Sequence, residues 1–214
     1  MTALKSLLLS RLPWIEHGFG TRDSAPPGDL IVLKQVHSAT VIVARDPAGS
    51  NPPGIGDALV GDALVTNQPG LALPIRTADC VPILLADTRN HAIAAIHAGW
   101  RGSAARIAEA AIKRMRAEFG TEPTGVLAAL GPAIGVCCYS VGEEVARQFG
   151  YRRAMNLDLA EENRKQLLAA GVPEAGIETL AICTRCDSQR FHSYRRDRED
   201  AGRQISFIRI VRAH

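Results

Sequence analysis

A cysteine and a histidine stand at the outer ends of two apolar segments that are joined by the turn-forming sequence DTRN. Cys80 precedes the first segment and His97 follows the second. If the segments form a hairpin centred between Thr88 and Arg89, Cys80 faces His97 at its open end, on the same side of the sheet. Directly opposed residues have Cβ atoms about 4.5–5.5 Å apart. The spacing therefore predicts that a thiolate and an imidazole bind one metal ion together.

A third protein ligand would complete such a site. His37 ends the sequence KQVH between two strand candidates, which is the same kind of position. Two imidazoles and one thiolate leave a fourth position on zinc for water or substrate, as in catalytic rather than structural zinc sites. The residues alone do not separate His37 from His17 or His91, and a lone cysteine or histidine is more often an ordinary core or surface residue. Pro82 could also place a bulge in the hairpin.

Strands and helices that would position these residues alternate along the chain. Strands are expected over residues 29–36, 40–44, 71–75, 81–86, 91–96, 125–130, 177–183 and 206–211. Helices are expected over 103–119, over 141–149, and from an N-cap at Asp158 to Gly171. Several strands are apolar on both faces, so helices should cover them. The pattern predicts a layered α/β fold, with a Pro- and Gly-rich loop over 46–57.

Several arginines near these segments could bind an anion. Arg76 and Asp79 lie at the same strand end as Cys80, Arg101 lies at the start of a helix, and Arg195 belongs to the sequence SYRRD. Arginine matches phosphate through paired hydrogen bonds. We therefore treat Arg76, Arg101 and Arg195 as candidate phosphate ligands, and Arg76, Asp79 and Cys80 as candidate catalytic residues. Solvated arginines and a structural turn role for Asp79 are the alternatives.

Four further cysteines form two close pairs in the sequence. Cys183 and Cys186 make a CxxC sequence, and Cys137 and Cys138 are adjacent. One CxxC pair is weak evidence for zinc, because a structural site needs four ligands. We expect Cys183 and Cys186 to be buried or half-buried thiols, and adjacent cysteines rarely form a disulfide with each other.

Composition limits the class of protein. With 214 residues, 46% of them hydrophobic and 22% charged, the chain fits one globular domain over 1–214. The net charge of +3 comes from scattered Lys and Arg, which does not suggest a nucleic-acid partner. No apolar stretch reaches the roughly 18 residues that a membrane span needs. Five cysteines, an odd number, and no signal-like N-terminus favour reduced thiols in the cytoplasm.

Seven sequence blocks, in this order, resemble the signature blocks of one family, the YfiH-type laccase-domain family, also called the polyphenol oxidase or purine nucleoside phosphorylase family. They cover nearly the whole chain, and the combination of ADC with HAGWRG is highly specific. The blocks are KQVH (34–37), DALVT (62–66), RTADCVPILLAD (76–87), IHAGWRG (96–102), LGPAIGVCCYSVGEEV (130–145), FHSYRRD (191–197) and AGRQISFI (201–208).

The resemblance implies a four-layer α/β/β/α sandwich of mixed sheets covered by helices. It also implies a metal held by the residues that match the family's ligands, namely His37, Cys80 and His97. Members are described as zinc-dependent enzymes that phosphorolyse adenosine, inosine, guanosine and methylthioadenosine and that deaminate adenosine. The expected partners are therefore purine nucleosides and inorganic phosphate, for a monomer or homodimer. The segment between Arg22 and Lys34 is shorter than in the family and lacks its helix.

Other functions remain open at this point. Some family members are described as copper-containing phenol oxidases, and copper could occupy a misloaded zinc site because it stands highest in the affinity order. Multicopper laccases, however, use many histidines, often in HxH pairs, and this chain has six histidines and no such pair. One bacterial branch is connected with editing of peptidoglycan precursors. A non-catalytic metal-binding protein is the remaining alternative.

Overall fold

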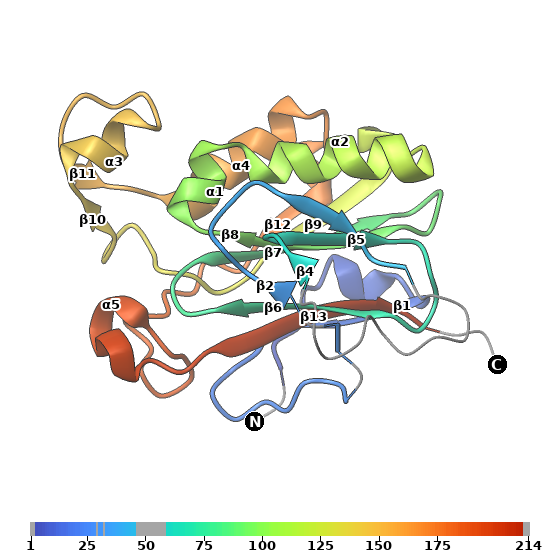
Figure 1. Cartoon of the computed structure of the whole chain (residues 1–214), viewed down its shortest axis with the longest axis horizontal. Helices are drawn as coiled ribbons and strands as arrows, with labels where there is room; N and C mark the ends of the chain where they lie inside the picture. Colours follow the sequence, from blue (N-terminus) through green and yellow to red (C-terminus); the bar gives the residue numbers. More distant parts are fainter. Residues whose placement is uncertain (1–2, 29, 32, 46–58, 212–214) are drawn as a thin grey trace.

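A six-stranded mixed sheet forms the centre of the molecule (Figure 1). The computed structural model describes residues 3–28, 30–31, 33–45 and 59–211. The two outer pairs of strands are parallel, and the inner pairs are antiparallel. In spatial order the strands are β12 (Ile177–Thr179), β9 (Val126–Leu130), β7 (Val81–Asp87), β8 (Ile93–Ala98), β5 (Ala63–Thr66) and β3 (Val41–Val43).

A second, antiparallel sheet packs against one face of the first (Figure 1). Its strands, in spatial order, are β1 (Ile15–Gly18), β13 (Gln204–Ile210) and β6 (Ala72–Thr77). Two small pairs accompany the sheets: β2 (Leu33–Lys34) with β4 (Leu59–Val60), and β10 (Ser140–Val141) with β11 (Met155–Asn156).

Helices cover the other face of the six-stranded sheet (Figure 1). The α-helices are α1 (Trp100–Ala104), α2 (Ile107–Phe119), α3 (Glu143–Arg147), α4 (Leu159–Ala169) and α5 (Tyr194–Asp197). Short 3-10 turns are η1 (Leu9–Arg11), η2 (Pro123–Gly125), η3 (Glu174–Gly176) and η4 (Arg198–Asp200). Within the described residues, none of these helices is long and apolar enough to cross a membrane.

Alternating side chains of β7 divide the interior into two apolar cores. Ile83 and Leu85 point to the core under α2 and α4, whereas Leu84 and Ala86 point to the core between the two sheets. All four are fully buried. A strand that is covered on both faces is apolar throughout, which explains the uninterrupted apolar runs in the sequence. The expected α/β class with mixed sheets and covering helices is confirmed.

The segment between Arg22 and Lys34 is short, and in the described residues no α-helix contributes to the core between the two sheets. The core between the sheets takes its residues from strands, from η1 and from loops, and none from an α-helix. Between Arg22 and Lys34 the described residues form no helix. This agrees with the short segment noted in the sequence. The loop expected over 46–57 lies outside the described residues.

The expected helix over 103–119 is two helices. Arg106 adopts a left-handed backbone conformation (φ 62°) that separates α1 from α2. α1 begins at Trp100, directly after β8, because Gly99 supplies an extended N-cap there. The helix expected from Asp158 is confirmed: the Asp158 carboxylate accepts a hydrogen bond from the backbone N–H of Glu161 (2.9 Å).

The hairpin register predicted from the sequence is wrong by two residues. His97 pairs with Pro82 rather than with Cys80. The reason is local: the Asp87 carboxylate accepts hydrogen bonds from the backbone N–H groups of Arg89 (2.9 Å) and Asn90 (3.2 Å). This side-chain turn begins at Asp87 and moves the centre of the hairpin one residue along the chain.

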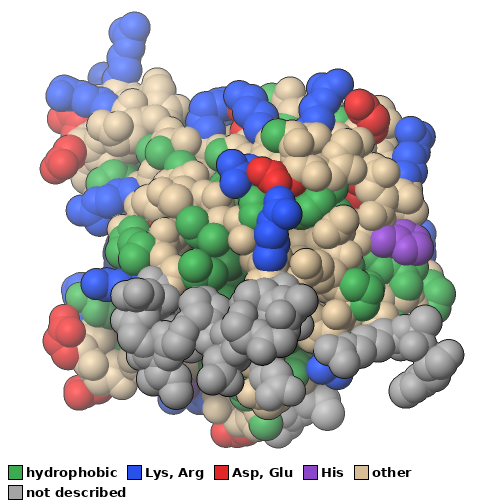
Figure 2. Space-filling view, turned by 45° about the vertical axis from the view of Figure 1, so that its right-hand side comes forward, with side chains coloured by type: hydrophobic (Ala, Val, Ile, Leu, Met, Phe, Trp, Pro, Cys, Tyr) green, Lys and Arg blue, Asp and Glu red, His purple; other side chains and the backbone are tan. Residues whose placement is uncertain are grey.

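The expected strand over 177–183 ends at Thr179, because Ala181 has a positive φ of 53°. Strands β1 and β5 were not expected from the sequence. On the face that Figure 2 shows, Lys and Arg side chains stand separately along the helix-bearing edge. The scattered cationic residues of the sequence therefore do not merge into one basic patch on that face.

Candidate metal centre and the adjoining cavity

His37, Cys80 and His97 come together at one end of the two-sheet body. The nitrogen and sulfur atoms that could bind a metal all lie within 4.8 Å of one another. His97 belongs to β8, Cys80 directly precedes β7, and His37 lies between β2 and β3. The rings of His37 and His97 meet edge to face with centroids 4.8 Å apart. The structure thus brings together the three residues that the sequence selected.

Cys80 and His97 still lie close together although the predicted register was wrong. A shift of two residues leaves every side chain on the same face, whereas a shift of one would reverse it. Cys80 therefore becomes a diagonal neighbour of His97 and still shares its face. Gly99 now stands opposite Cys80, and an added Cβ there would lie 2.9 Å from His37 Cδ2 and 3.0 Å from Cys80 Sγ. Only glycine leaves both ligands their present positions.

Asp62 orients His97. The Nδ1–H of His97 donates to Asp62 Oδ1 at 2.8 Å, and both side chains are almost fully buried. Burial by itself raises the pKa of Asp62, but hydrogen bonds from His97 and Ser38 outweigh it and hold this pKa well below its usual range. The carboxylate is therefore ionised and fixes the proton on Nδ1. Nε2 is then the ring nitrogen of His97 that a metal would bind in place of a proton, an arrangement common at zinc sites.

The same carboxylate shapes the backbone at His37. Asp62 accepts hydrogen bonds from the backbone N–H groups of Val36 (3.2 Å), His37 (2.9 Å) and Ser38 (2.6 Å). These bonds hold His37 at a positive φ of 60°, a conformation that non-glycine residues rarely adopt. One buried carboxylate thus positions two of the three candidate ligands.

Electrostatics favour a thiolate in this group of residues. Burial raises the pKa of Cys80, but hydrogen bonds with His37 and His97 lower it to about 7 overall. Burial lowers the pKa of His97, but Asp62 and Cys80 raise it to about 9. Each residue therefore stabilises the charge of the other. A borderline-soft divalent cation fits this donor set, because it would replace the protons that the three side chains now share.

A cavity of about 910 Å³ opens beside the three residues, and His37, Cys80 and His97 form part of its wall. This volume is at the upper end of the range for small-molecule sites. The three arginines selected from the sequence, Arg76, Arg101 and Arg195, line it together with two that the sequence analysis missed, Arg198 and Arg203. In the described part of the chain, no acidic side chain forms an ion pair with any of these five.

Aromatic side chains form another part of the wall. Trp100, Tyr139 and Tyr194 line the cavity. The guanidinium of Arg101 lies 4.2 Å from the Trp100 ring centroid, and that of Arg195 lies 5.2 Å from the Tyr139 ring centroid. Such contacts hold a cation in place while leaving its N–H groups available. The cavity therefore combines anion-binding groups with flat apolar surfaces.

Asp79 holds two segments of the cavity wall together. Its carboxylate accepts hydrogen bonds from Thr184 Oγ1 (2.7 Å), Ser193 Oγ (3.1 Å) and the backbone N–H of Arg195 (2.6 Å). Asp79 has a positive φ of 87° and directly precedes Cys80. It therefore ties the segment that carries Arg195 to the strand end that carries Cys80. The carboxylate beside His97 is Asp62, not Asp79.

Sequence reasoning missed Asp62, Arg198 and Arg203. Asp62 pairs across β5 and β8 with His97, whose backbone N–H donates to Asp62 O (2.7 Å). The available signal was the acidic residue that begins the sequence DALVT, since metal-bound histidines usually donate to a carboxylate or a carbonyl. Arg198 and Arg203 lie in the irregular segment after α5, where no periodic pattern points to a site.

Comparison with known proteins identifies relatives over most of the chain. Residues 20–211 match the sequence model of the family described as multi-copper polyphenol oxidoreductase laccase. A protein of Bacteroides thetaiotaomicron named purine nucleoside phosphorylase is 39% identical over 86% of this chain and 74% of its own length. A protein named adenosine deaminase RL5, from an unknown prokaryotic organism, is 35% identical over 84% of this chain and 74% of its own length.

Two crystal structures have similar folds. The hypothetical protein YfiH of Bacillus licheniformis superimposes with a TM-score of 0.83 at 28% identity, over 92% of each chain. YlmD of Geobacillus stearothermophilus superimposes with a TM-score of 0.79 at 34% identity, over 86% of this chain and 74% of that one. Relatives in this family carry the names of nucleoside-processing enzymes, and three of the family's blocks supply the His37–Cys80–His97 group. The protein belongs to the laccase-domain family of YfiH and YlmD.

Proposed function

We propose that the protein is a zinc-dependent purine nucleoside phosphorylase that also deaminates adenosine. The observation that carries the proposal is the single cavity that joins the His37–Cys80–His97 group to five arginines and three aromatic side chains. The names of relatives, purine nucleoside phosphorylase and adenosine deaminase RL5, supply the two reactions. Adenosine, inosine, guanosine and methylthioadenosine are the proposed substrates, with inorganic phosphate as the acceptor.

Zinc bound by His37, Cys80 and His97 would supply a Lewis acid at the wall of the cavity. Asp62 keeps the ring of His97 in the tautomer and orientation that ligation needs. His37 is the most exposed of the three residues, and it lines the cavity from the segment between β2 and β3. A zinc ion held by these three side chains would still be able to bind water or substrate.

Phosphate is proposed to bind among the arginines. In phosphorolysis, a phosphate oxygen forms the new bond to the C1′ carbon of the ribose while the bond from C1′ to the base breaks. The base leaves with the bonding electron pair and takes up a proton. Arg76, Arg101 and Arg195 all reach the cavity and can donate paired hydrogen bonds to phosphate oxygens. Arg198 and Arg203 extend the same cationic wall.

The base is proposed to stack on the aromatic side chains. All three line the cavity: Trp100 is half-buried, Tyr194 is exposed, and Tyr139 is 9% exposed. A purine has two apolar faces, and stacking on one aromatic ring contributes about 1–3 kcal/mol per base in nucleic-acid complexes. Asp79 is a positioning residue in this scheme, because it holds the backbone of Arg195.

A copper-dependent phenol oxidase is the second candidate, and the description of the matching family favours it. The cavity wall favours a single metal ion, because His37, Cys80 and His97 are the only group of candidate ligands in its described part. Multicopper oxidation needs several coppers close together, and the chain has six histidines in all. Among the described residues, no contact favours editing of peptidoglycan precursors or a non-catalytic role.

The test measures release of ribose-1-phosphate and free base from inosine and adenosine, with zinc-loaded and with copper-loaded protein. Base release should require phosphate and saturate with it. Cys80→Ser should abolish release, whereas Lys113→Ala, an exposed change on α2, should not affect it. Base release that ignores phosphate would identify a hydrolase, and phenol oxidation by the copper form without any base release would favour the oxidase.

A further inference from the structure

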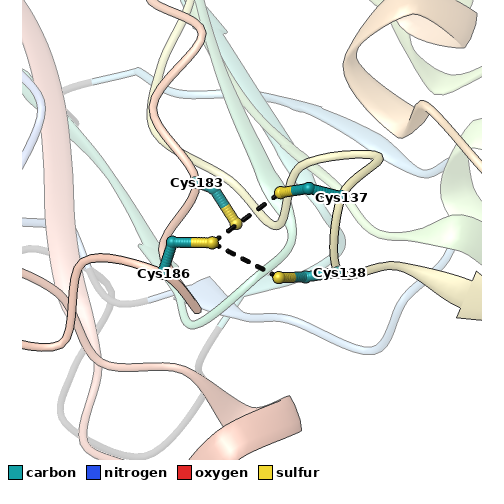
Figure 3. Close-up of side chains that lie close together, drawn as sticks. All are labelled: Cys137, Cys138, Cys183 and Cys186. Carbon is teal, nitrogen blue, oxygen red and sulfur yellow. Dashed lines mark hydrogen bonds between the residues drawn. The ribbon is translucent and has the colours of Figure 1, made fainter.

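Four cysteine side chains converge outside the cavity. Cys137 and Cys138 lie on one loop, Cys183 and Cys186 lie on another, and their sulfur atoms point toward one another (Figure 3). All four sulfurs lie within 4.8 Å of one another. We propose that these four cysteines form a second metal site, a structural zinc site with four thiolate ligands.

The distances between the sulfurs fit one tetrahedral zinc ion. Cys186 Sγ lies 3.4 Å from Cys138 Sγ and 3.7 Å from Cys137 Sγ. A Zn–S bond of about 2.3 Å gives an S–S edge of about 3.8 Å in a tetrahedron. A disulfide requires about 2.0 Å, and all five cysteines of the chain are free thiols. The four sulfurs are therefore at the separation of metal ligands and not of bonded pairs.

The fold brings the two pairs together through adjacent parallel strands. β9 leads into the loop with Cys137 and Cys138, and β12 leads into the loop with Cys183 and Cys186. Because β9 and β12 are parallel neighbours, their carboxyl ends lie at the same edge of the sheet. A bridge between Ala133 and Cys183 continues this pairing up to the cysteines. The CxxC sequence provides only two of the four ligands that a structural zinc site needs. The pairing of β9 with β12 brings in the other two, Cys137 and Cys138.

The backbone around the sulfurs has the features of a thiolate site. The backbone N–H of Gly135 donates to Cys183 Sγ at 3.2 Å, and hydrogen bonds to sulfur stabilise metal-bound thiolates. An added Cβ on Gly135 would lie 3.3 Å from Cys137 Sγ, so the backbone approaches both pairs closely. Four thiolates and Zn²⁺ carry a net charge of −2. The Arg185 guanidinium lies beside Cys138 and offsets part of this charge.

Zinc at this position would join the two loops that wall the cavity. The first loop continues to Tyr139 and the second leads to Arg195, and both residues line the cavity. Arg195 also donates from Nη1 to Ser140 O at 3.0 Å. The second site therefore fixes the distance between an aromatic and a cationic part of the cavity wall. It does not take part in the chemistry, and it does not depend on the proposed reaction.

Native mass spectrometry of protein purified under reducing conditions with zinc supplied should count two zinc ions per chain. Cys183→Ser/Cys186→Ser should retain one ion, Cys80→Ser should also retain one, and Ser188→Ala in the same loop should retain both. Cobalt(II) substitution adds a spectroscopic readout. The intense thiolate-to-cobalt absorption should persist in Cys80→Ser and fall several-fold in the double variant, because the first site contributes a single thiolate.

Thiol alkylation of the wild-type protein keeps the test independent of whether the variants fold. With zinc bound, Cys137, Cys138, Cys183 and Cys186 should resist iodoacetamide, and a strong chelator should make them reactive together. A single zinc ion in the wild-type protein that Cys183→Ser/Cys186→Ser still retains would overturn the proposal. So would iron in place of zinc, rapid alkylation of the exposed Cys137 and Cys186 with zinc present, or a disulfide between the two loops under reducing conditions.

Discussion

Asp62 and His97 stand directly opposite each other across the antiparallel pair of β5 and β8, joined through both backbone and side chain. The backbone N–H of His97 donates to Asp62 O (2.7 Å) and its ring Nδ1–H donates to Asp62 Oδ1 (2.8 Å). Asp62 also accepts the backbone N–H of His37. A single buried carboxylate thus connects the two histidine ligands of the candidate metal centre, although it is not itself within the ligand group.

Asp62→Asn should weaken zinc binding about 10–100-fold, the usual cost of losing an outer hydrogen-bond partner of a metal ligand. Asparagine is uncharged and has one acceptor oxygen where the carboxylate has two. Both the His97 ring and the backbone at His37 should therefore lose their fixed orientation. Competition with a chromophoric chelator measures the change. Asp158→Asn is the matched control, since asparagine is an equally good N-cap there and zinc affinity should not change. Equal affinity in the two variants would remove Asp62 from the site.

Gly99→Ala should weaken zinc binding by at least about tenfold, because its Cβ would displace His37 and Cys80, from which it would lie 2.9 Å and 3.0 Å. The overall stability should change much less. Gly28→Ala is the control, since an added Cβ at Gly28 meets no atom within 4 Å. The measurements are zinc affinity and urea unfolding for each variant. Normal zinc affinity in Gly99→Ala would show that the three ligands have more room than their contacts with this glycine indicate.

Arg76→Ala should raise the KM for phosphate roughly tenfold or more, the cost of losing a charged hydrogen bond. The KM for the nucleoside should change little, because the apolar part of the wall is elsewhere. Steady-state kinetics at varied phosphate and fixed inosine separate the two effects. Arg114→Ala on α2 is the control, an exposed arginine of the same type. A change in nucleoside KM with unchanged phosphate KM would assign Arg76 to the other substrate.

His17 should make the fold less stable in mild acid. Burial and the nearby Lys5 lower the pKa of His17 from 6.5 to about 4, and its Nε2 accepts the backbone N–H of Ser6 (3.0 Å). The unfolded chain therefore takes up this proton first as the pH falls from 6.5 toward 4. The free energy of unfolding should drop across that window, by on the order of 3 kcal/mol at most, and be level above it.

Urea unfolding between pH 4.5 and 7.5 measures this contribution as the difference between wild type and His17→Gln, which should show a shallower slope. His91→Gln is the control, because His91 is exposed and stacks on Trp14 with ring centroids 4.4 Å apart. Identical slopes for His17→Gln and the wild type would mean that other groups account for the loss of stability in acid.

Part of the site could be predicted from the sequence because the prediction does not require the exact strand register. The apolar runs around DTRN predict a hairpin whatever its exact register, and a slip of two residues keeps Cys80 and His97 on one face. The choice of His37 over other histidines came from the family resemblance and not from spacing. The exact register of the hairpin depends on the turn that the Asp87 side chain forms, and the sequence DTRN is compatible with more than one turn.

Other parts could not be predicted because they depend on contacts between distant segments. β5 is only four residues long and buried on both faces, so its sequence lacks the alternation of apolar and polar residues that indicates a strand. Its pairing with β8 nevertheless places Asp62 opposite His97. The second group of cysteines depends on the parallel pairing of β9 and β12. A CxxC sequence considered alone contains no information about that pairing.

The arginines of the cavity also have a consequence for the rate at which substrates arrive. Asp79 is the only carboxylate in the described wall, and it already accepts three hydrogen bonds, so cationic side chains outnumber carboxylates around the cavity and should attract anions. Long-range attraction of this kind is screened over about 8 Å at physiological ionic strength. Capture of phosphate should therefore slow as salt is added, whereas capture of an uncharged nucleoside should not. The two proposed substrates would then enter the same cavity at rates that depend differently on salt.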